Sequence, residues 1–599
     1  MAKDMPIESF LGVRSARGPK FSADGKTVYF LSDESGVPQV WNCDISDAKA
    51  TPKQLTDHRS SVSRVEMAAT SSDLIYVMDR DGDERHQFYF VAAGTSSAKP
   101  LTSAPQVMHN WGCWSSDASK IAFTANYRDP GVMDVYICDL RTGERQMVVE
   151  SGGLYTVEAG TADFSRLILI ETIGSAFQRL HVVDGEGSGL RCLTPKEGDC
   201  RYQQFEWCSD NRHFYGLSNF GRDFLGFARF DAEDGRIEWL HTPDHDIEEM
   251  ALSRDETQVA FASNIDGYSA LFVMNLSDGT IRQAPDTSRS VITGPNWSPD
   301  GSALVFAREG STRPSDIWIW DLRRDRVRQV THSDLAGFST DDWIEPELIH
   351  FNTFDDRLIP AFFYRPRTPR PTNGYPVIVE VHGGPEAQFR PSFAPELQFY
   401  LSLGYAVAAP NVRGSTGYGA RYAALDDRHK RMESVRDLKH LHGWLAAQGD
   451  VDGRRIAISG GSYGGFMVLA ALTEYPDLWK AAVEFYGIVD FQSFLERTGP
   501  WRRRHRAMEY GDPVADAALL RDISPLHKSD RIRAPLFVAQ GLTDPRVPPH
   551  ESEQIVQALR ERSAPVSYLI IPDEGHGFVK LENRIKVYSG VHQFLRHFL

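Results

Sequence analysis

The sequence predicts two domains of different classes: an all-β, seven-bladed propeller over residues 1–340, including a short N-terminal segment, and an α/β domain over residues 341–599. Two observations predict this division. One turn motif recurs seven times in the first half of the chain, and apolar strands alternate with helix-length segments in the second. A chain of 599 residues is also longer than one hydrophobic core ordinarily organises.

The recurring turn of the first half consists of a small residue, usually serine, placed shortly before an aspartate. Its aspartates stand 44 to 49 residues apart, at Asp24, Asp73, Asp117, Asp163, Asp210, Asp255 and Asp300. Short β-rich runs such as 258–262 and 303–307 follow the turns. This period is typical of propeller blades. Unrelated β-sandwich modules are the alternative, and the fourth unit, in which no glycine follows Asp163, is the weakest match.

The second half predicts a doubly wound, mainly parallel sheet. Between its short apolar runs lie helix-length segments such as residues 434–448. The expected strands are 376–381, 405–409, 455–459, 481–485, 536–540 and 566–571. Residues 332–344 are expected to form a polar connection between the domains.

Charge and composition exclude several classes of function. The net charge of -16 argues against nucleic acid as a partner, because a nucleic-acid interface needs an excess of basic residues. The N-terminus lacks the apolar core of a signal peptide, and no stretch reaches a membrane-spanning length, so a cytoplasmic protein without membrane contact is expected. The six cysteines form no C-x-x-C pair and are expected to be reduced. No metal is assigned and no cofactor is expected.

The segment Gly460-Gly-Ser-Tyr-Gly464 lies between an apolar strand and a helix rich in Ala, Leu and Met. This G-x-S-x-G pattern is that of a nucleophile elbow, a sharp turn that lifts a serine out of a sheet. A glycine-rich turn that matches by chance is the alternative. The choice depends on whether a base and an acid follow in the chain, because a serine hydroxyl alone is a poor nucleophile.

Two later residues stand where an α/β-hydrolase places that acid and base. Asp544 follows the expected strand 536–540, and His576 follows 566–571. Functional groups of such sheets collect at these strand ends. Ser462, Asp544 and His576 are therefore predicted to form a catalytic triad, the alternative being a turn aspartate and a surface histidine. The backbone N–H of Tyr463 and the loop His382-Gly-Gly-Pro385 would supply the oxyanion hole.

Residues 345–599 resemble the catalytic domain of the prolyl oligopeptidase family, and the propeller extends the resemblance over nearly the whole chain. The matching stretches are 382–385, 411–419, 460–465, 541–548 and 575–578. They are most similar to the acylaminoacyl peptidase and bacterial dipeptidyl-peptidase-like branches. Prolyl oligopeptidases proper usually carry a tyrosine where this chain has His382, so the resemblance implies a backbone donor, that of Gly384, in the oxyanion hole.

The same resemblance implies a substrate-binding set. Arg546 matches a position whose guanidinium holds a substrate carbonyl one residue before the scissile bond. An apolar, ring-lined specificity pocket would be built by Ile488, Phe491, Phe494 and Val547. A surface arginine and ordinary core aromatics are the alternatives.

Two charged stretches are given smaller roles. Residues 80–86, in the second blade, are expected to be a solvated loop, although carboxylates of the propeller hold the substrate amino terminus in related exopeptidases. The basic run 501–506 is expected to be a solvated helix face or the edge of an interface.

The preferred interpretation is a serine peptidase of acylaminoacyl-peptidase type that hydrolyses short peptides, with the propeller limiting substrate size. Dipeptidyl-peptidase or oligopeptidase activity, and an esterase or amidase acting on a small non-peptide substrate, remain open. A propeller scaffold with an inactive hydrolase domain would lack a triad member, and none is missing from the sequence. A homo-oligomer is a further expectation from the resemblance.

Overall fold

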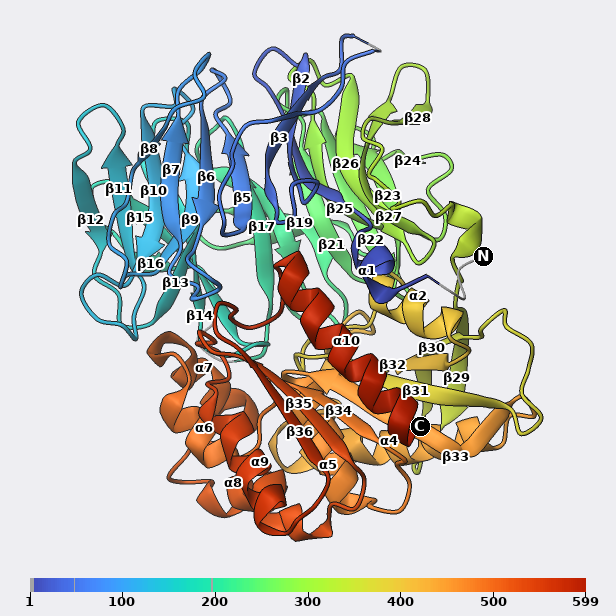
Figure 1. Cartoon of the computed structure of the whole chain (residues 1–599). Coiled ribbons are helices and arrows are strands. Elements are labelled where there is room, and N and C mark those ends of the chain that lie inside the picture. The colour runs from blue at the N-terminus through green and yellow to red at the C-terminus, as the bar shows by residue number, and fades with distance from the viewer. Residues whose placement is uncertain (1–4, 48, 195–197) are drawn as a thin grey trace.

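The computed structural model describes residues 5–47, 49–194 and 198–599. It contains a propeller stacked on an α/β domain (Figure 1). Seven four-stranded antiparallel sheets form the propeller, each from consecutive strands. Their strands are β1 (Ala16–Phe21), β2 (Thr27–Ser32), β3 (Gln39–Asp44) and β4 (Lys53–Gln54); β5 (Val62–Met67), β6 (Leu74–Met78), β7 (Gln87–Val91) and β8 (Ala98–Pro100); β9 (His109–Trp114), β10 (Lys120–Ala125), β11 (Asp134–Asp139) and β12 (Arg145–Val149); β13 (Leu154–Gly160), β14 (Arg166–Thr172), β15 (Gln178–Asp184) and β16 (Arg191–Cys192); β17 (Tyr202–Trp207), β18 (His213–Ser218), β19 (Gly226–Asp231) and β20 (Ile237–His241); β21 (Ile247–Leu252), β22 (Gln258–Ile265), β23 (Tyr268–Asn275) and β24 (Ile281–Gln283); and β25 (Val291–Trp297), β26 (Ala303–Gly310), β27 (Arg313–Asp321) and β28 (Arg326–Gln329).

The recurring serine–aspartate turn connects the first two strands of the blades. In the first blade the Ser22 hydroxyl donates to Asp24 Oδ1 at 2.7 Å, and the backbone N–H of Thr27 donates to Ser22 Oγ. The hydrogen bond from Ser22, followed by one from the backbone N–H of Lys26, holds the pKa of the Asp24 carboxyl below its usual value. The fourth blade builds the same turn with Thr161 in place of serine, and Phe164 adopts the left-handed backbone there (φ 58°) without glycine. The seven-bladed prediction is confirmed.

The propeller is closed into a ring by side-chain contacts between its first and last blades. In the described residues no strand from one end of the propeller completes a sheet at the other. Instead β1 packs against β25, β26 and β27. The backbone N–H of Phe21 donates to Asn296 Oδ1 at 3.0 Å, and the Ser315 hydroxyl donates to the carbonyl of Ala16 at 2.7 Å. An apolar cluster that includes Phe21 and Ile319 fills the seam.

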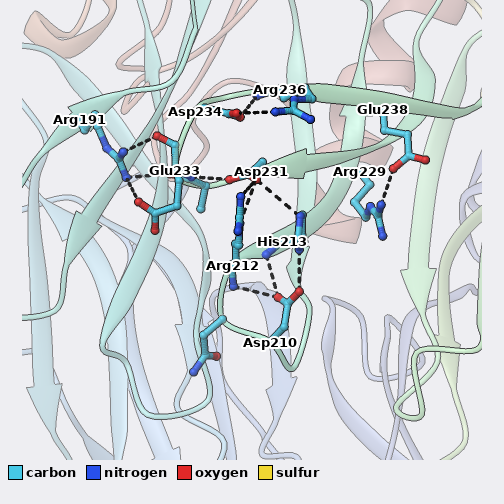
Figure 2. Close-up of polar contacts among 12 residues, drawn as sticks. Arg191, Asp210, Arg212, His213, Arg229, Asp231, Glu233, Asp234, Arg236 and Glu238 are labelled. Atoms are coloured by element: carbon cyan, nitrogen blue, oxygen red, sulfur yellow. Dashed lines mark hydrogen bonds and ion pairs between the residues drawn. The ribbon is translucent and has the colours of Figure 1, made fainter.

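Ion pairs brace the turns of the fifth blade (Figure 2). Arg212 donates through Nε and Nη2 to Asp231 Oδ2, at 3.0 and 2.7 Å. The His213 ring lies 2.6 Å from Asp210, and Arg191 of the fourth blade reaches Glu233. Because the arginines are largely exposed, solvent screens these pairs and they contribute little to the stability of the fold. They orient the loops more than they stabilise the blade.

The second domain is built on one eight-stranded sheet. Its order is β29-β30-β32-β31-β33-β34-β35-β36, with antiparallel pairing at β29–β30 and β30–β32 and parallel pairing elsewhere. The strands are β29 (Glu347–Asn352), β30 (Leu358–Tyr364), β31 (Tyr375–Val381), β32 (Ala406–Pro410), β33 (Val451–Gly461), β34 (Ala482–Phe485), β35 (Leu536–Gly541) and β36 (Val566–Ile571). The mainly parallel α/β prediction is confirmed, and all six expected strands are present as β31–β36.

Helices cover both faces of this sheet. Residues of α4, α5 and α9 share one apolar core with the sheet, and α1, α2 and α10 share the other. The helices are α1 (Ile7–Leu11), α2 (Pro395–Ser402), α3 (Ala420–Ala423), α4 (Arg431–Ala446), α5 (Tyr463–Glu474), α6 (Phe491–Arg497), α7 (Pro500–Tyr510), α8 (Ala517–Ile523), α9 (His550–Glu561) and α10 (Leu581–Phe598). Short 3-10 turns lie at η2 (Thr340–Asp342), η3 (Ala424–Asp426), η4 (Arg428–Lys430) and η5 (Pro525–Arg531).

The N-terminal segment packs on the α/β domain. Helix α1 contacts α2 and α10, and the Phe10 ring lies 5.3 Å from that of Phe399 in α2 (centroid to centroid). Trp343, within the stretch expected to be a polar connection, is 1% exposed and packs against the Phe10 ring. The expectation for residues 332–344 is therefore wrong at this end, because aromatic burial anchors the connection. None of the described helices is long and apolar enough to cross a membrane.

Replacing Phe10 with Ala should lower the free energy of unfolding of the α/β domain by about 3–5 kcal/mol, because the ring is buried and its loss leaves a cavity. Thermal unfolding followed by circular dichroism measures this. Phe220, 38% exposed in the propeller, supplies the control, and Phe220→Ala should leave the transition unchanged. Equal transitions in the two variants would contradict the anchoring role of α1.

Candidate active site

Ser462 occupies the turn between β33 and α5. Its backbone adopts φ 59° and ψ -124°, a left-handed conformation that costs a non-glycine residue about 1–3 kcal/mol. Two backbone hydrogen bonds hold it: the N–H of Ser462 donates to the carbonyl of Phe485, and its carbonyl accepts from the N–H of Phe466. The hydroxyl is thereby presented at the end of the sheet.

Glycines make this turn possible because, without a side chain, they let neighbouring backbone segments pack closely together. A Cβ added to Gly464 would lie 2.2 Å from the carbonyl oxygen of Val381, and one added to Gly460 would lie 2.6 Å from that of Gly464. Real Cβ atoms do not approach oxygen so closely. The first turn of α5 therefore lies directly against β31, and only glycine at these positions permits that approach.

Three of the predicted site residues lie in one chain of hydrogen bonds. His576 Nε2 is 2.9 Å from Ser462 Oγ, and His576 Nδ1 is 2.7 Å from Asp544 Oδ2. The other oxygen of Asp544 accepts from the backbone N–H groups of Arg546 and Val547, at 2.8 and 3.0 Å. The loops after β33, β35 and β36 thus bring together groups that are 82 and 114 residues from Ser462.

Asp544 is in a position to set the tautomer of His576. The carboxylate can only accept a hydrogen bond, so Nδ1 carries the proton and Nε2 is free to accept one. Asp544 is 4% exposed, which keeps water from competing for this bond. The Tyr486 ring packs against the imidazole of His576, with 4.8 Å between the two ring centroids, and restricts the rotation of the imidazole.

The loop of His382 to Pro385 lies beside the serine. A Cβ added to Gly383 would be 3.4 Å from Ser462 Cβ, so the backbone of this loop passes close to Ser462. Both ring nitrogens of His382 are engaged, Nδ1 with the carbonyl of Gly383 at 2.7 Å and Nε2 with Ser415 Oγ at 2.8 Å. Burial lowers the pKa of His382, so the neutral ring serves to hold the loop. Gly384, the next residue, keeps its predicted oxyanion role as a prediction.

Behind the other predicted donor, Tyr463, lies a buried ionic network. Its hydroxyl donates to Asp426 Oδ2 at 2.9 Å and accepts from Arg431 at 3.1 Å. Arg431, fully buried, also pairs with Glu509 of α7. Asp426, Asp427 and Glu509 could together suggest a cation site, but the guanidinium of Arg431 bridges two of them. Sequence reasoning missed this network, because no spacing links residues of four separate elements.

The predicted specificity residues Ile488, Phe491, Phe494 and Val547 are all buried, each at most 2% exposed. The Phe491 and Phe494 rings lie 4.7 and 6.1 Å from the ring of Tyr510. Tyr510 in turn stacks 6.4 Å from Tyr463. The rings of Phe491 and Phe494 therefore lie near Ser462 but pack against Tyr510. That these residues line a specificity pocket stays a prediction.

Arg546 makes an interdomain contact that the sequence did not indicate. Its Nε donates to Glu84 of the second blade. A cavity of about 210 Å³ lies beside this pair, and its lining includes Asp79, His86 and His576. The carbonyl-holding role of Arg546 stays a prediction.

The loop of residues 79–86 packs on the loops that carry the predicted acid and base. Asp81 accepts from Lys580 Nζ at 2.6 Å, and its carbonyl accepts from the Thr543 hydroxyl at 2.5 Å. A Cβ added to Gly82 would lie 2.6 Å from the backbone nitrogen of Gly575. The expectation of a solvated loop is wrong at Asp81 and Glu84, because these two carboxylates pair with Lys580 and Arg546 across the domain interface.

The chain is similar to known peptidases. Residues 391–599 match a family model described as the prolyl oligopeptidase family. The chain is 25% identical over 602 residues to dipeptidyl aminopeptidase BIII of Pseudoxanthomonas mexicana, covering 96% of this chain and 85% of the relative. It is 26% identical over 232 residues to the acylamino-acid-releasing enzyme of Rattus norvegicus, covering 37% and 31%. The solved structure of a puromycin-hydrolysing peptidase of Mycobacterium tuberculosis superposes with a TM-score of 0.88 at 20% identity, covering 100% of this chain and 96% of that one.

Replacing Gly464 with Ala should separate α5 from β31, destabilise the domain by about 3 kcal/mol or more and abolish hydrolysis, because the new methyl group would overlap the Val381 carbonyl. The matched control is Gly443→Ala within α4, where no atom lies within 4 Å of the added Cβ. That change should stabilise the domain by about 0.5–1 kcal/mol. Denaturant unfolding and anilide hydrolysis report both effects; a stable, active Gly464→Ala protein would refute the packing argument.

Proposed function

We propose that this protein is a serine peptidase of the prolyl oligopeptidase family, that Ser462, His576 and Asp544 form its catalytic triad, and that short peptides are its substrates. The observation that carries this proposal is the unbroken chain of hydrogen bonds from Asp544 through His576 to Ser462. The three side chains come from loops at the same edge of a parallel sheet, the usual place for a site in this class of fold.

In the proposed reaction His576 Nε2 takes the proton of Ser462 as Oγ attacks the scissile carbonyl carbon. The same nitrogen then delivers that proton to the departing amine, leaving an acyl-enzyme that water hydrolyses by the reverse route. Asp544 stabilises the imidazolium that forms in each step. The backbone N–H groups of Tyr463 and Gly384 would donate to the oxyanion of the tetrahedral intermediate.

Arg546 is proposed to orient the acyl part of the substrate. Its bond to Glu84 uses Nε, and the two terminal nitrogens form no hydrogen bond with described residues. They are available to donate to a substrate carbonyl. Such a fork contributes mainly by holding the peptide in register with Ser462.

Substrate size would be limited by the propeller. The loop of residues 79–86 lies directly on the loop of His576, so the path to Ser462 is bounded by both domains. An extended peptide fits such a space, whereas a folded protein does not.

We favour the dipeptidyl-aminopeptidase type over the acylaminoacyl type. The catalytic motifs are common to both, but in sequence two dipeptidyl peptidases match 96% and 97% of the chain, whereas the acylamino-acid-releasing enzyme of Rattus norvegicus matches 37% of it. Since the cleft is shared by the propeller and the catalytic domain, similarity over both is the better guide to which end of a peptide is bound. The acylaminoacyl type is the second candidate.

Replacing Ser462 with Ala should lower kcat by about 10⁶-fold, as expected for removal of a triad nucleophile. Asp544→Asn should lower it by about 10⁴-fold, because the amide would favour the wrong tautomer of His576. Both variants should unfold at the temperature of the wild type. Steady-state hydrolysis of a peptide anilide measures the losses, and substantial activity in Ser462→Ala would rule out the proposed nucleophile.

A panel of four substrates should separate the candidate activities. We expect Ala-Phe p-nitroanilide, with a free amino terminus, to have a kcat/KM at least about tenfold above that of acetyl-Ala-Phe p-nitroanilide, a difference of about 1.4 kcal/mol. A preference for acetyl-Phe p-nitroanilide would instead support the acylaminoacyl type. Turnover of p-nitrophenyl acetate alone would contradict peptidase action and favour the esterase.

A further inference from the structure

One face of α7 points into the interface between the two domains. Arg502, His505, Arg506 and Glu509 are spaced i, i+3, i+4 and i+7, so they lie along one side of the helix. The intervening Arg503 and Arg504 are exposed. The basic run therefore divides into a solvated side and a less exposed side, from which His505 reaches the fourth blade of the propeller.

Every member of this face except Arg502 has a partner. His505 Nε2 lies 2.8 Å from the Ser175 hydroxyl of the fourth blade, and Arg506 lies 3.3 Å from Glu386. Glu509 pairs with Arg431. By contrast, the Arg502 guanidinium makes no hydrogen bond or ion pair with any residue that the structure describes, and its Nε is buried.

The charges around Arg502 do not balance. Burial, and after it the nearby positive charges of Arg506 and Arg546, lowers the pKa of Arg502 to about 10. Arg502 is therefore still a cation at neutral pH. The two nearby carboxylates, Glu386 and Glu84, are already paired with Arg506 and Arg546. A partly buried guanidinium without an anion is costly to desolvate, which favours a ligand that brings the anion.

The position of Arg502 relates it to the acyl side of the substrate. Arg546 follows the triad residue Asp544 by two positions and is proposed to hold a carbonyl one residue before the scissile bond. Tyr510, at the end of the same helix, packs on the rings of the predicted specificity pocket. The substrate residue whose carbonyl Arg546 is proposed to hold lies one position before the residue that contributes the scissile carbonyl. Its side chain would therefore extend towards Arg502.

We propose that Arg502 forms a subsite for a carboxylate side chain on that residue, so that peptides with Glu or Asp there are preferred substrates. This inference rests on the proposed function, since it names the substrate class of the same site. A guanidinium can donate two parallel hydrogen bonds to a carboxylate, which an uncharged amide of equal size cannot match in strength. For a peptide with a free amino terminus, the acidic residue would be the first.

The test compares Glu-Phe and Gln-Phe p-nitroanilides, which differ in one charge. In the wild type, kcat/KM should be at least about tenfold higher for Glu-Phe, equivalent to about 1.4 kcal/mol. In Arg502→Met the ratio should fall to about one, and in Arg502→Lys it should fall only in part, since lysine keeps the charge but not the fork. Arg503→Met, on the exposed side of α7, is the matched control and should keep the wild-type ratio.

A structural role for Arg502 makes different predictions. Because the guanidinium has no partner among the described residues, Arg502→Met should unfold at or above the wild-type temperature, and hydrolysis of Gln-Phe p-nitroanilide should be nearly unchanged. No preference for Glu in the wild type, or a preference that persists in Arg502→Met, would overturn the proposal.

Binding separates this inference from the proposed function. In the Ser462→Ala variant, calorimetry should show the dipeptide Glu-Phe binding at least about tenfold more tightly than Gln-Phe, and Ser462→Ala/Arg502→Met should bind both equally. Tighter binding of Glu-Phe without hydrolysis of any anilide by the wild type would support the subsite and refute the peptidase reaction. Equal binding of the two dipeptides to the Ser462→Ala variant would refute the subsite.

Discussion

The strained backbone of Ser462 is the constraint on which the rest of the site depends. A residue with φ 59° lies at the end of β33 only because Gly460 and Gly464 let the start of α5 lie against β31. Once the serine is held there, the loops after β35 and β36 end beside it, since parallel strands finish at one edge of the sheet. Burial in the sheet core stabilises a turn that local preference alone would disfavour.

Much of this arrangement could be predicted from the sequence. The aspartate period indicated seven blades because each blade repeats one turn. The residues of the predicted triad stand just beyond apolar runs that are strands in the structure. The antiparallel strands β29 and β30 were not predicted, because exposed residues such as His350 and Asn352 alternate with buried ones along β29 and resemble a polar connection. The packing of α1 was equally hidden, since five residues carry no period that identifies a distant partner.

The parts of the site that the sequence could not reveal are pairings of charge between distant elements. Glu84 and Arg546 are separated by 462 residues, and Arg431 meets an aspartate, a tyrosine and a glutamate from three other elements. A sequence shows that such residues are charged but not which of them meet. These pairings matter because residues of both domains line the cleft beside Arg546. The propeller therefore contributes charge to the site as well as covering it, and Arg502 is the one guanidinium on the α7 face that the described fold leaves unmatched.

The central claim is that the geometry around Ser462 makes this one hydroxyl nucleophilic. The most direct test is to treat the native protein with a fluorophosphonate, digest it and locate the added mass by tandem mass spectrometry. The account predicts one modification per chain, on Ser462, and its loss when the protein is unfolded before treatment. Modification of a different serine, or none at all in the folded protein, would contradict it.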